Sequence, residues 1–409
     1  MSRDFDLVIV GAGPIGASLA CLMAARKLSA AARVALIAER LPEAPPAGAD
    51  WDLRVFALGR ASQRLLEQAG IWQRLPPARV APYERMCVWS GSGAADAGSL
   101  SFDCAEIGEA NLGCIVEGRA LQWQGLQSAR AAGITLIEAA VEGIAVHEGG
   151  AHLRLRDGRE LGTPLLAAAD GTESACRTLL GIETAGHAYQ QDALVAHVRT
   201  AQAHRATAWQ RFLPGGPLAL LPLPDGRSSI VWSTARAEAA RLRALDAAAF
   251  GAELTVASAE VLGACELTTS IASFPLKLQY ALDYVRPHAV LLGDAAHAVH
   301  PLAGQGLNLG LMDCAALIEV LGDAADARSF GDLRLLRRYE RWRKSENLLA
   351  AAAFDGLDRL FSNANPALAG LRSAGLSAVG RLPFLKRGFA RHALGLDGDI
   401  PAFLRQEPV

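Results

Sequence analysis

The sequence has 409 residues and a formal net charge of −2 at pH 7. A chain of this length can bury a large core and divide into two or three domains, and its small net charge gives no bulk attraction to nucleic acid. Its 7 cysteines are scattered, without a CxxC pair or a His/Cys cluster at metal spacing. We therefore predict a reducing compartment, no metal site and no nucleic-acid partner.

The first apolar segment begins after Asp4 and Asp6 and ends in glycines, which favours a first strand over a signal peptide. No apolar run approaches the roughly 18 residues that cross a bilayer. We expect a cytoplasmic protein without a membrane-spanning segment.

The N-terminal pattern predicts a strand over residues 5–10, a helix over 14–28 and a strand over 33–38, with GAGPIG between the first two. A GxGxxG motif in this position is typical of a dinucleotide site. Its first glycine makes the tight turn, its second lets a pyrophosphate approach, and its third lets the helix pack on the strand. The candidate residues are Gly11, Gly13, Pro14 and Gly16.

An acidic residue after the second strand would hold the ribose hydroxyls, and Glu39, followed by Arg40, is the candidate. Glu39 stands one place beyond Ala38, the expected end of the strand. Because successive side chains point to opposite faces of a strand, Glu39 reaches the ribose only if the strand ends in a bulge. A solvated loop carboxylate is the alternative.

Two arginines lie where a cofactor could use them. Arg54 interrupts the apolar segment 51–59 and needs an anionic or carbonyl partner. That partner is either a cofactor pyrophosphate or a carboxylate in a buried salt bridge. Residues 86–90 and 100–104 predict a hairpin that leaves the first domain. Beyond it, Arg119 opens a helix and either reaches the cofactor or faces solvent.

A second candidate fragment follows an alternating segment over residues 134–169, which has a hairpin turn at 147–150. Its last apolar strand delivers Asp170 and Gly171. This arrangement fits a cofactor site, and it fits equally a strand, a turn and a capped helix without a ligand.

Residues 187–280 have a different sequence pattern from the preceding part of the chain. The strands predicted there are separated by Pro-Gly and Asp-Gly turns and form an antiparallel sheet, with a helical stretch over about 235–261 covering one side. These strands are residues 192–200, 208–213, 218–222 and 228–234.

The third fragment begins with an apolar strand over residues 289–292, which places Gly293 and Asp294 at its end. Asp294 can accept a hydrogen bond from a ribityl or ribose hydroxyl. After a turn that contains Pro301, a glycine-rich turn opens a helix at about Leu307, whose free N–H groups suit an electron-rich, partly anionic ring edge.

The remaining chain predicts helices over 311–321 and 333–361 and a broken region over 383–392. The broken region mixes aromatic and basic residues. A solvated helical face and a contact with a membrane surface both explain this composition. The basic residues in this region and just before it are Arg381, Lys386, Arg387 and Arg391.

The three fragments, in the order GxGxxG, DG and GD, resemble the single-component flavin aromatic hydroxylases of the para-hydroxybenzoate hydroxylase fold. Four segments resemble one branch, the ubiquinone-biosynthesis hydroxylases: LRVFAL at 53–58, LGCIVE at 112–117, FPL at 274–276 and HPLAGQGLNLG at 300–310. Two departures are the displaced Glu39 and Gly118, where the family usually has asparagine.

This resemblance implies an α/β fold, with a Rossmann-like FAD-binding domain, an inserted antiparallel-sheet substrate domain and C-terminal helices. The FAD-binding domain comprises residues 1–80, 105–182 and 281–345, the substrate domain comprises the hairpin 81–104 and residues 183–280, and the helical region comprises 346–409.

The resemblance also implies the cofactors. NAD(P)H reduces FAD, O₂ adds to the reduced ring, and a flavin hydroperoxide hydroxylates a phenol held near His300 and Pro301. The chain has no second GxGxxG motif, which fits transient NAD(P)H binding. The cofactor-binding residues implied are Gly11, Gly13, Pro14, Gly16, Glu39, Arg40, Arg54, Arg119, Asp170, Gly171, Gly293, Asp294, Pro301, Gly304, Gln305, Gly306, Leu307 and Asn308.

The implied substrate is a lipophilic, polyprenylated phenol of ubiquinone biosynthesis, in a groove formed by strands of 192–234 and the C-terminal helices. Peripheral contact with the inner membrane, homo-oligomerisation and a biosynthetic complex stay open. So do hydroxylation of another aromatic compound and a non-catalytic FAD-binding role in an assembly. A prenyl-chain reductase or flavin halogenase shares the fold, but the halogenase signature WxWxIP is absent.

Overall fold

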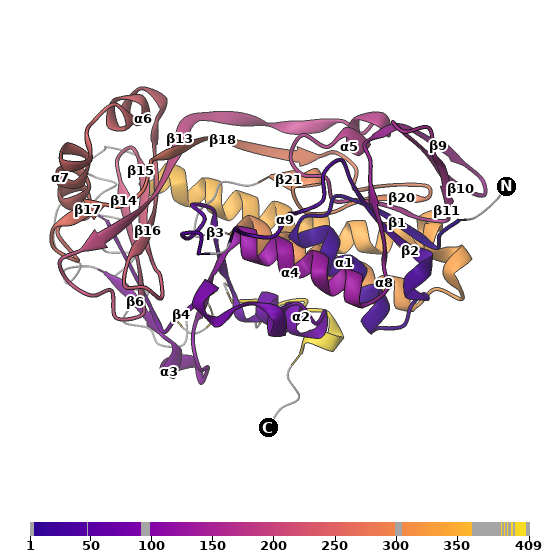
Figure 1. Cartoon of the computed structure of the whole chain (residues 1–409), viewed down its shortest axis with the longest axis horizontal. Helices are drawn as coiled ribbons and strands as arrows, with labels where there is room; N and C mark the ends of the chain where they lie inside the picture. The colour runs from indigo at the N-terminus through magenta and orange to yellow at the C-terminus, as the bar shows by residue number, and fades with distance from the viewer. Residues whose placement is uncertain are drawn as a thin grey trace.

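The computed structural model describes residues 4–46, 48–90, 99–298, 305–361, 386, 388, 391, 394–395 and 397–405. Its elements lie in two lobes, one around β1 (Leu7–Val10) and α1 (Pro14–Ala25) and the other around α7 (Ala247–Ala257) (Figure 1). Two long paired strands, β13 (Thr184–Thr200) and β18 (Ala272–Ala281), run from one lobe to the other.

Within the described residues, six strands form a sheet in the order β19-β20-β12-β1-β2-β8, in which only β19 is antiparallel to its neighbour. Its central strands are continuously apolar because both faces are covered; Leu7, Val8 and Ile9 are 0% exposed. Helix α1 packs against both α4 and α8. The other elements of this layer are β2 (Val34–Ala38), α4 (Gly118–Ala131), β8 (Thr135–Glu138), β12 (Leu166–Ala168), α5 (Ala175–Leu179), β19 (Val285–Arg286), β20 (Ala289–Leu291) and α8 (Gln305–Gly322).

Helix α1 ends at Ala25, three residues before the end predicted from the sequence. Lys27 adopts a left-handed backbone conformation with φ 55°. The N–H of Lys27 then bonds Ala24 O at 3.0 Å and that of Leu28 bonds Met23 O at 3.1 Å. This Schellman arrangement satisfies the last carbonyl groups and stops the helix.

The second large sheet has nine strands in the described part of the chain, in the order β21-β18-β13-β16-β15-β14-β5-β6, with β17 paired to β13. Its predicted antiparallel strands are confirmed, although β5 pairs with β14 in parallel. Helices α6 and α7 cover one face, where Leu194, Leu218 and Phe250 share a buried cluster. The remaining elements are β5 (Arg85–Ser90), β6 (Leu100–Asp103), β14 (Thr207–Leu213), β15 (Gly216–Pro222), β16 (Ser228–Ala235), α6 (Arg236–Arg243), β17 (Cys265–Leu267) and β21 (His297–Ala298).

Strand β13 starts at Thr184, well before the predicted start at Asp192. Its pairing with β18 changes register between Ala188 and Asp192, where Gln190 has φ 51°. Such an irregularity bends a strand without ending it. One strand can therefore contribute to the wall between both lobes.

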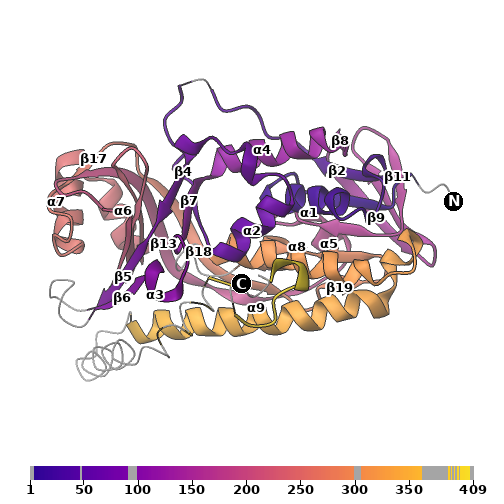
Figure 2. The ribbon, with the colours of Figure 1, turned by 90° about the horizontal axis from the view of Figure 1, so that it is seen from below.

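Within the part of the chain that the structure describes, two three-stranded sheets and the long helix α9 are the remaining large elements (Figure 2). Helix α9 packs along α8, which begins at Gln305 rather than at Leu307. These elements are β3 (Val55–Leu58), α2 (Arg60–Gln68), β4 (Val80–Tyr83), α3 (Cys104–Ile107), β7 (Gly113–Glu117), β9 (Val141–His147), β10 (Gly150–Leu155), β11 (Glu160–Thr163) and α9 (Leu333–Phe361). The 3-10 helices are η1 (Ala31–Arg33), η2 (Trp72–Arg74), η3 (Pro77–Arg79), η4 (Gly293–Ala295), η6 (Ala327–Gly331) and η7 (Ala402–Leu404).

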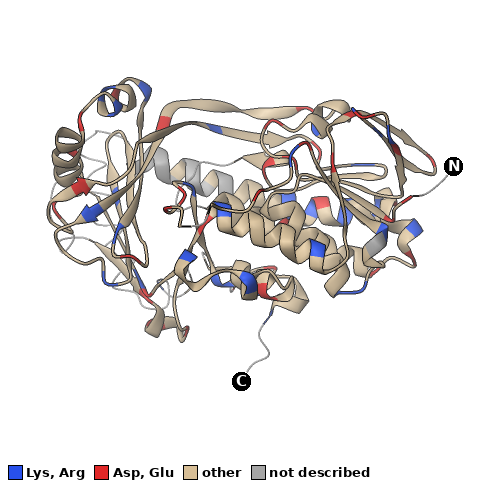
Figure 3. Cartoon of the chain, viewed as in Figure 1, with Lys and Arg blue, Asp and Glu red and all other residues tan. Residues whose placement is uncertain are grey.

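Acidic and basic residues are interspersed along the ribbon in Figure 3. Among the helices that the structure describes, none is both long enough and apolar enough to cross a bilayer.

Candidate cofactor and substrate site

A cavity of about 1220 Å³ lies where β1, β2, β12 and β20 end. Because these strands are parallel, their carboxyl ends meet at one edge of the sheet, which is where open α/β sheets bind ligands. The same cavity continues to one face of the nine-stranded sheet. It therefore joins a cofactor cradle to a second, more apolar space.

The GAGPIG turn forms one wall of the cradle. Gly11 has φ 112°, and a Cβ there would lie 2.2 Å from Ala169 O. A Cβ on Gly16 would lie 1.9 Å from Gly11 O, so the fold itself requires both glycines. A Cβ on Gly13, in contrast, would meet nothing within 4 Å. Gly13 lines the cavity, and α1 has no side-chain cap at this N-cap residue, so free N–H groups are available to a pyrophosphate.

Glu39 and Arg40 both line the cavity beyond the end of β2. Glu39 Oε1 accepts a hydrogen bond from Arg156 Nη1 at 2.7 Å, although both side chains are more than 60% exposed. Arg156 also lines the cavity, and no sequence motif singles it out because it follows a different strand, β10. The ribose contact of Glu39 stays a prediction.

Arg54 and Arg119 occupy different surroundings. Arg54 lines the cavity and is exposed, with its guanidinium 5.1 Å from the centroid of the Phe56 ring. No carboxylate of the described residues pairs with it, so the buried salt bridge considered from the sequence is absent there. Arg119 lies 3.9 Å from Asp52 and is not among the cavity residues, whereas Gln122, one turn later, is.

The Asp-Gly fragment after β12 also reaches the cavity. Asp170 accepts hydrogen bonds from Ser174 Oγ at 2.5 Å and from Cys176 N at 3.0 Å, so it holds the start of α5. The buried Arg177 donates to Thr172 O and to Ala295 O, each at 2.9 Å. Arg177 thus joins the Asp-Gly turn to the Gly-Asp turn.

Asp294 lines the same cavity as residues of the first two fragments. Thr172 Oγ1 donates to Asp294 Oδ2 at 3.5 Å. Gly293, in the left-handed region with φ 56°, would place a Cβ 3.1 Å from Ile15. The Gly-Asp turn is therefore packed closely on α1, while its carboxylate faces the open cavity.

The N-terminus of α8 supplies another part of the lining through Gly306 and Leu307. A Cβ on Gly306 would meet nothing within 4 Å. The side chain of Asn308 is occupied: Oδ1 accepts from Gly59 N and Ser62 Oγ, and Nδ2 donates to Ala57 O. Asn308 therefore fixes α8 to β3 and α2, and any cofactor contact of its backbone stays a prediction.

The predicted residues His300, Pro301 and Gly304 lie outside the described residues, so their roles stay predictions. Gln305 is the first residue of α8.

A buried polar cluster behind the Gly-Asp turn was missed by the sequence analysis. Asp313 is 0% exposed; its Oδ2 accepts from His297 Nε2 at 2.6 Å and Gly293 N at 3.0 Å. Its Oδ1 accepts from Arg343 Nε at 2.8 Å and Asn347 Nδ2 at 3.1 Å. The available signal was polar side chains on the apolar faces of two predicted helices.

Burial alone would raise the pKa of Asp313, but the charges of His297 and Arg343 outweigh it and lower the pKa to about 2. Asp313 is therefore ionised at neutral pH. Its charge holds the backbone of the Gly-Asp turn against α8 and α9.

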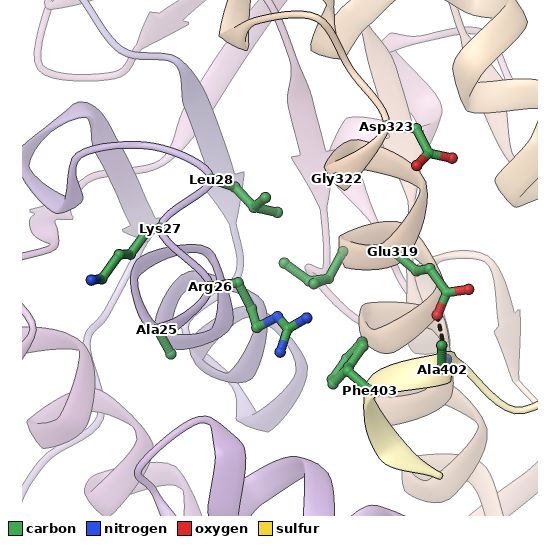
Figure 4. A pocket seen from close by; sticks show the side chains of 10 residues that line it. Ala25, Arg26, Lys27, Leu28, Glu319, Gly322, Asp323, Ala402 and Phe403 are labelled. Carbon is green, nitrogen blue, oxygen red and sulfur yellow. Dashed lines mark hydrogen bonds between the residues drawn. The ribbon is translucent and has the colours of Figure 1, made fainter.

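A smaller cavity of about 540 Å³ lies between the end of α1, the end of α8 and η7 (Figure 4). Three of its charged side chains have partners: Arg26 stacks on Phe403, Ala402 N donates to Glu319, and Asp323 pairs with Arg338. It contains no glycine turn at a strand end. We therefore assign the cofactor to the larger cavity.

The larger cavity fits a flavin dinucleotide on three observations. Gly13 and Gly306 leave open space beside the starts of two helices. The exposed Arg54 has no carboxylate partner in the described part of the chain. Asp294 and Glu39 present carboxylates to the cavity where hydroxyl groups need acceptors.

Comparisons with known proteins agree with this geometry. The FAD binding domain family matches residues 4–350. The chain is 34% identical over 405 residues to 3-demethoxyubiquinol 3-hydroxylase of Escherichia coli K12, covering 97% of this chain and 100% of that relative. It is 37% identical over 410 residues to the ubiquinone hydroxylase UbiL of Rhodospirillum rubrum, covering 99% and 93% respectively.

The fold is similar to that of the p-nitrophenol 4-monooxygenase PnpA from Pseudomonas putida DLL-E4, with a TM-score of 0.76. The match covers 96% of this chain and 99% of that chain at 17% identity. The predicted α/β class, with a Rossmann-like sheet and an antiparallel sheet, is confirmed.

Proposed function

Because this chain belongs to the FAD binding domain family, and specifically to the FAD-dependent aromatic monooxygenases, which use NAD(P)H and O₂, we propose that it hydroxylates the ring of a polyprenylated phenol in ubiquinone biosynthesis. Support for this substrate comes from two relatives that act on ubiquinone or a ubiquinol precursor by name and align over nearly the whole chain.

The observation that carries the proposal is the continuity of the cavity. It extends from the glycine turn and Asp294 to the face of the nine-stranded sheet that the helices leave uncovered. The strand residues on that face include Ala193, Val195 and Val231. An apolar wall beside a flavin cradle suits an aromatic ring with a lipophilic substituent.

The chain's own residues bind and orient the reactants. The start of α1 would hold the pyrophosphate, Asp294 a ribityl hydroxyl, and the start of α8 the edge of the ring system. When bound, FAD supplies the electron transfer from NAD(P)H and the activation of O₂. The apolar sheet wall excludes water from the space where oxygen is transferred.

A lipophilic substrate would place the enzyme on the cytoplasmic side of the inner membrane, in peripheral contact with it or with a partner that delivers the substrate. A homo-oligomer and a larger biosynthetic complex are both compatible with this location.

The proposal is tested by supplying the purified, FAD-loaded protein with NADH or NADPH and a set of prenylated phenols. We expect phenol-stimulated consumption of the reductant and incorporation of oxygen from labelled O₂ into the ring. A flavin-containing protein that no phenol stimulates would support a non-catalytic role. Stimulation by aromatic compounds without a prenyl chain, but not by prenylated ones, would assign another substrate.

A further inference from the structure

On the cavity-facing side of the nine-stranded sheet, paired residues of neighbouring strands form rows that run across the strands. Val195 of β13 pairs with Val231 of β16, Val231 with Ala219 of β15, and Ala219 with Gln210 of β14. All four residues line the cavity. Side chains of paired residues point to the same face, so this row is apolar until it reaches the amide of Gln210.

Gln210 is a buried polar group without a protein partner. It is 6% exposed and lines the cavity, and no hydrogen bond of its side chain occurs among the residues that the structure describes. The fully enclosed, unpaired polar atoms of the described residues do not include this amide, so it faces the open cavity, where water or a ligand completes its hydrogen bonds. A group that occupies the cavity is the expected partner.

Ser233 is a second polar residue on this face, in the neighbouring row, where it pairs with Ala193. It is 2% exposed and lines the cavity, and its hydroxyl has no partner within the described part of the chain. Strands β14 and β16 are separated by β15, which places them about 10 Å apart. Gln210 and Ser233 therefore bracket a space of ring size, floored by Ala219 and Val231.

The polar group that these side chains recognise is uncharged. The cavity residues contributed by β13 to β16 include no Asp, Glu, Lys or Arg; they are Ala193, Val195, Gln210, Pro217, Ala219, Leu221, Val231 and Ser233. Lys277 of the neighbouring β18 also lines the cavity, but its charge is paired with Glu173. A carboxylate buried against this wall would lack a counter-charge, which is costly. The amide oxygen of Gln210 and the hydroxyl oxygen of Ser233 can each accept the O–H of a phenol, which an ether lacks.

We infer that Gln210 and Ser233 bind the oxygen substituents of the aromatic ring and select an uncharged phenol over an aromatic acid or an ether. This inference rests on the proposed function, because it names the contacts of the substrate in the same site.

The test compares 2-propylphenol with its methyl ether, 2-propylanisole, and with 4-hydroxybenzoate. Binding to the FAD-loaded enzyme is followed by the change in flavin absorption. We expect the wild type to prefer the phenol to the ether by about tenfold, as one buried hydrogen bond provides, and to bind 4-hydroxybenzoate poorly. Gln210→Leu and Ser233→Ala should each reduce the phenol-to-ether ratio, with flavin content and melting temperature unchanged.

Ser228→Ala is the matched control. Ser228 lies on the same strand with 0% exposure, but on the opposite face of the sheet, so its removal should leave the ratio unchanged. If Gln210→Leu loses flavin or unfolds, Gln210→Met, which keeps the chain length, replaces it.

Wild-type ratios in both Gln210 and Ser233 variants would overturn this inference while leaving the proposed function intact. Binding of 4-hydroxybenzoate as tight as that of the phenol would overturn the selection of an uncharged ring. A wild type that no phenol affects, in binding or in reductant consumption, would overturn the proposed function and this inference together.

Discussion

The carboxylates of Asp294 and Asp313 lie on either side of the Gly-Asp turn and have different roles. Asp294 faces the cavity, whereas Asp313 is fully buried behind the turn and accepts the Gly293 N–H. A cavity carboxylate is available to a ligand hydroxyl, and a buried one fixes the backbone that presents it. Variants of the two residues should therefore differ in whether flavin binding or stability is lost first.

Asp294→Ala should purify folded but largely colourless. Losing a charge-assisted hydrogen bond to a ribityl hydroxyl costs roughly 1.5–3 kcal/mol, which weakens FAD binding about 10- to 100-fold. The measurement is flavin occupancy after gel filtration, together with titration of apoprotein with FAD. Asp323→Ala, which removes a carboxylate paired with Arg338 outside the larger cavity, is the control; wild-type occupancy in Asp294→Ala would show that the assigned role is wrong.

Asp313→Asn should destabilise the apoprotein by about 3–5 kcal/mol, because Arg343 is left buried without its counter-charge. The double variant Asp313→Asn/Arg343→Met removes both charges and should recover much of that stability. Urea unfolding of the apoproteins measures this difference. If flavin affinity recovers equally, Asp313 acts on stability alone; if it stays low, the contact with Gly293 N positions the cofactor turn.

The pH dependence of stability provides a separate check. The pKa of Asp313 is lowered in the fold, from 3.8 to about 2, so its contribution is fully present above the unfolded pKa and is lost as the pH falls through the folded one. Wild-type stability should therefore fall between about pH 4 and pH 2. The Asp313→Asn/Arg343→Met variant should show a shallower fall, and identical acid profiles by thermal unfolding would contradict the assignment.

At the scale of elements, the sequence predicted helices, strands and turns that depend on local patterns better than it predicted contacts between distant segments. The β1–α1–β2 unit, the β9–β10 hairpin and helix α9 follow from periodicity and turn residues. The early start of β13 was missed because residues 184–191 pair with β18, about ninety residues later in the chain. Asp313 was missed for the same reason: its partners His297 and Arg343 come from other elements, and no local pattern joins them.

The start of α8 should be sensitive to side-chain volume only when flavin is bound. A Cβ at Gly306 meets nothing within 4 Å, and the residue needs no left-handed conformation, so Gly306→Val should leave the melting temperature of the apoprotein nearly unchanged. The added methyl groups would occupy the cavity and lower FAD affinity or the rate of flavin reduction. Gly322→Val is matched to it, since Gly322 lies at the other end of α8 with equally open space. Normal flavin content and reduction in Gly306→Val would remove this segment from the site.

For the whole molecule, one cavity is built from segments that lie far apart in the chain. The glycine turn comes from residues near the N-terminus, the apolar wall from β13 to β16, and the start of α8 from residues beyond 300. Local sequence could indicate each fragment, but the continuity of the cavity depends on how β13 and β18 connect the lobes (Figure 1). The division into FAD-binding domain, substrate domain and C-terminal helices stays a proposal.

A lipophilic substrate also requires access to the membrane, for which the basic segment near the C-terminus is the candidate. Lys386 pairs with Glu106 at 2.6 Å and Arg391 with Asp397 at 2.9 Å, whereas Arg381 and Arg387 lie outside the described residues. A cation near an anionic leaflet contributes about 1 kcal/mol, and less when a carboxylate already neutralises it. Arg381→Gln/Arg387→Gln should therefore reduce co-sedimentation with anionic liposomes more than Lys386→Gln/Arg391→Gln does, while turnover of a soluble, short-chain phenol stays at the wild-type level. If the wild type does not associate with liposomes at low salt, or if the first pair of substitutions has no effect, delivery by a partner protein replaces membrane contact as the route of the substrate.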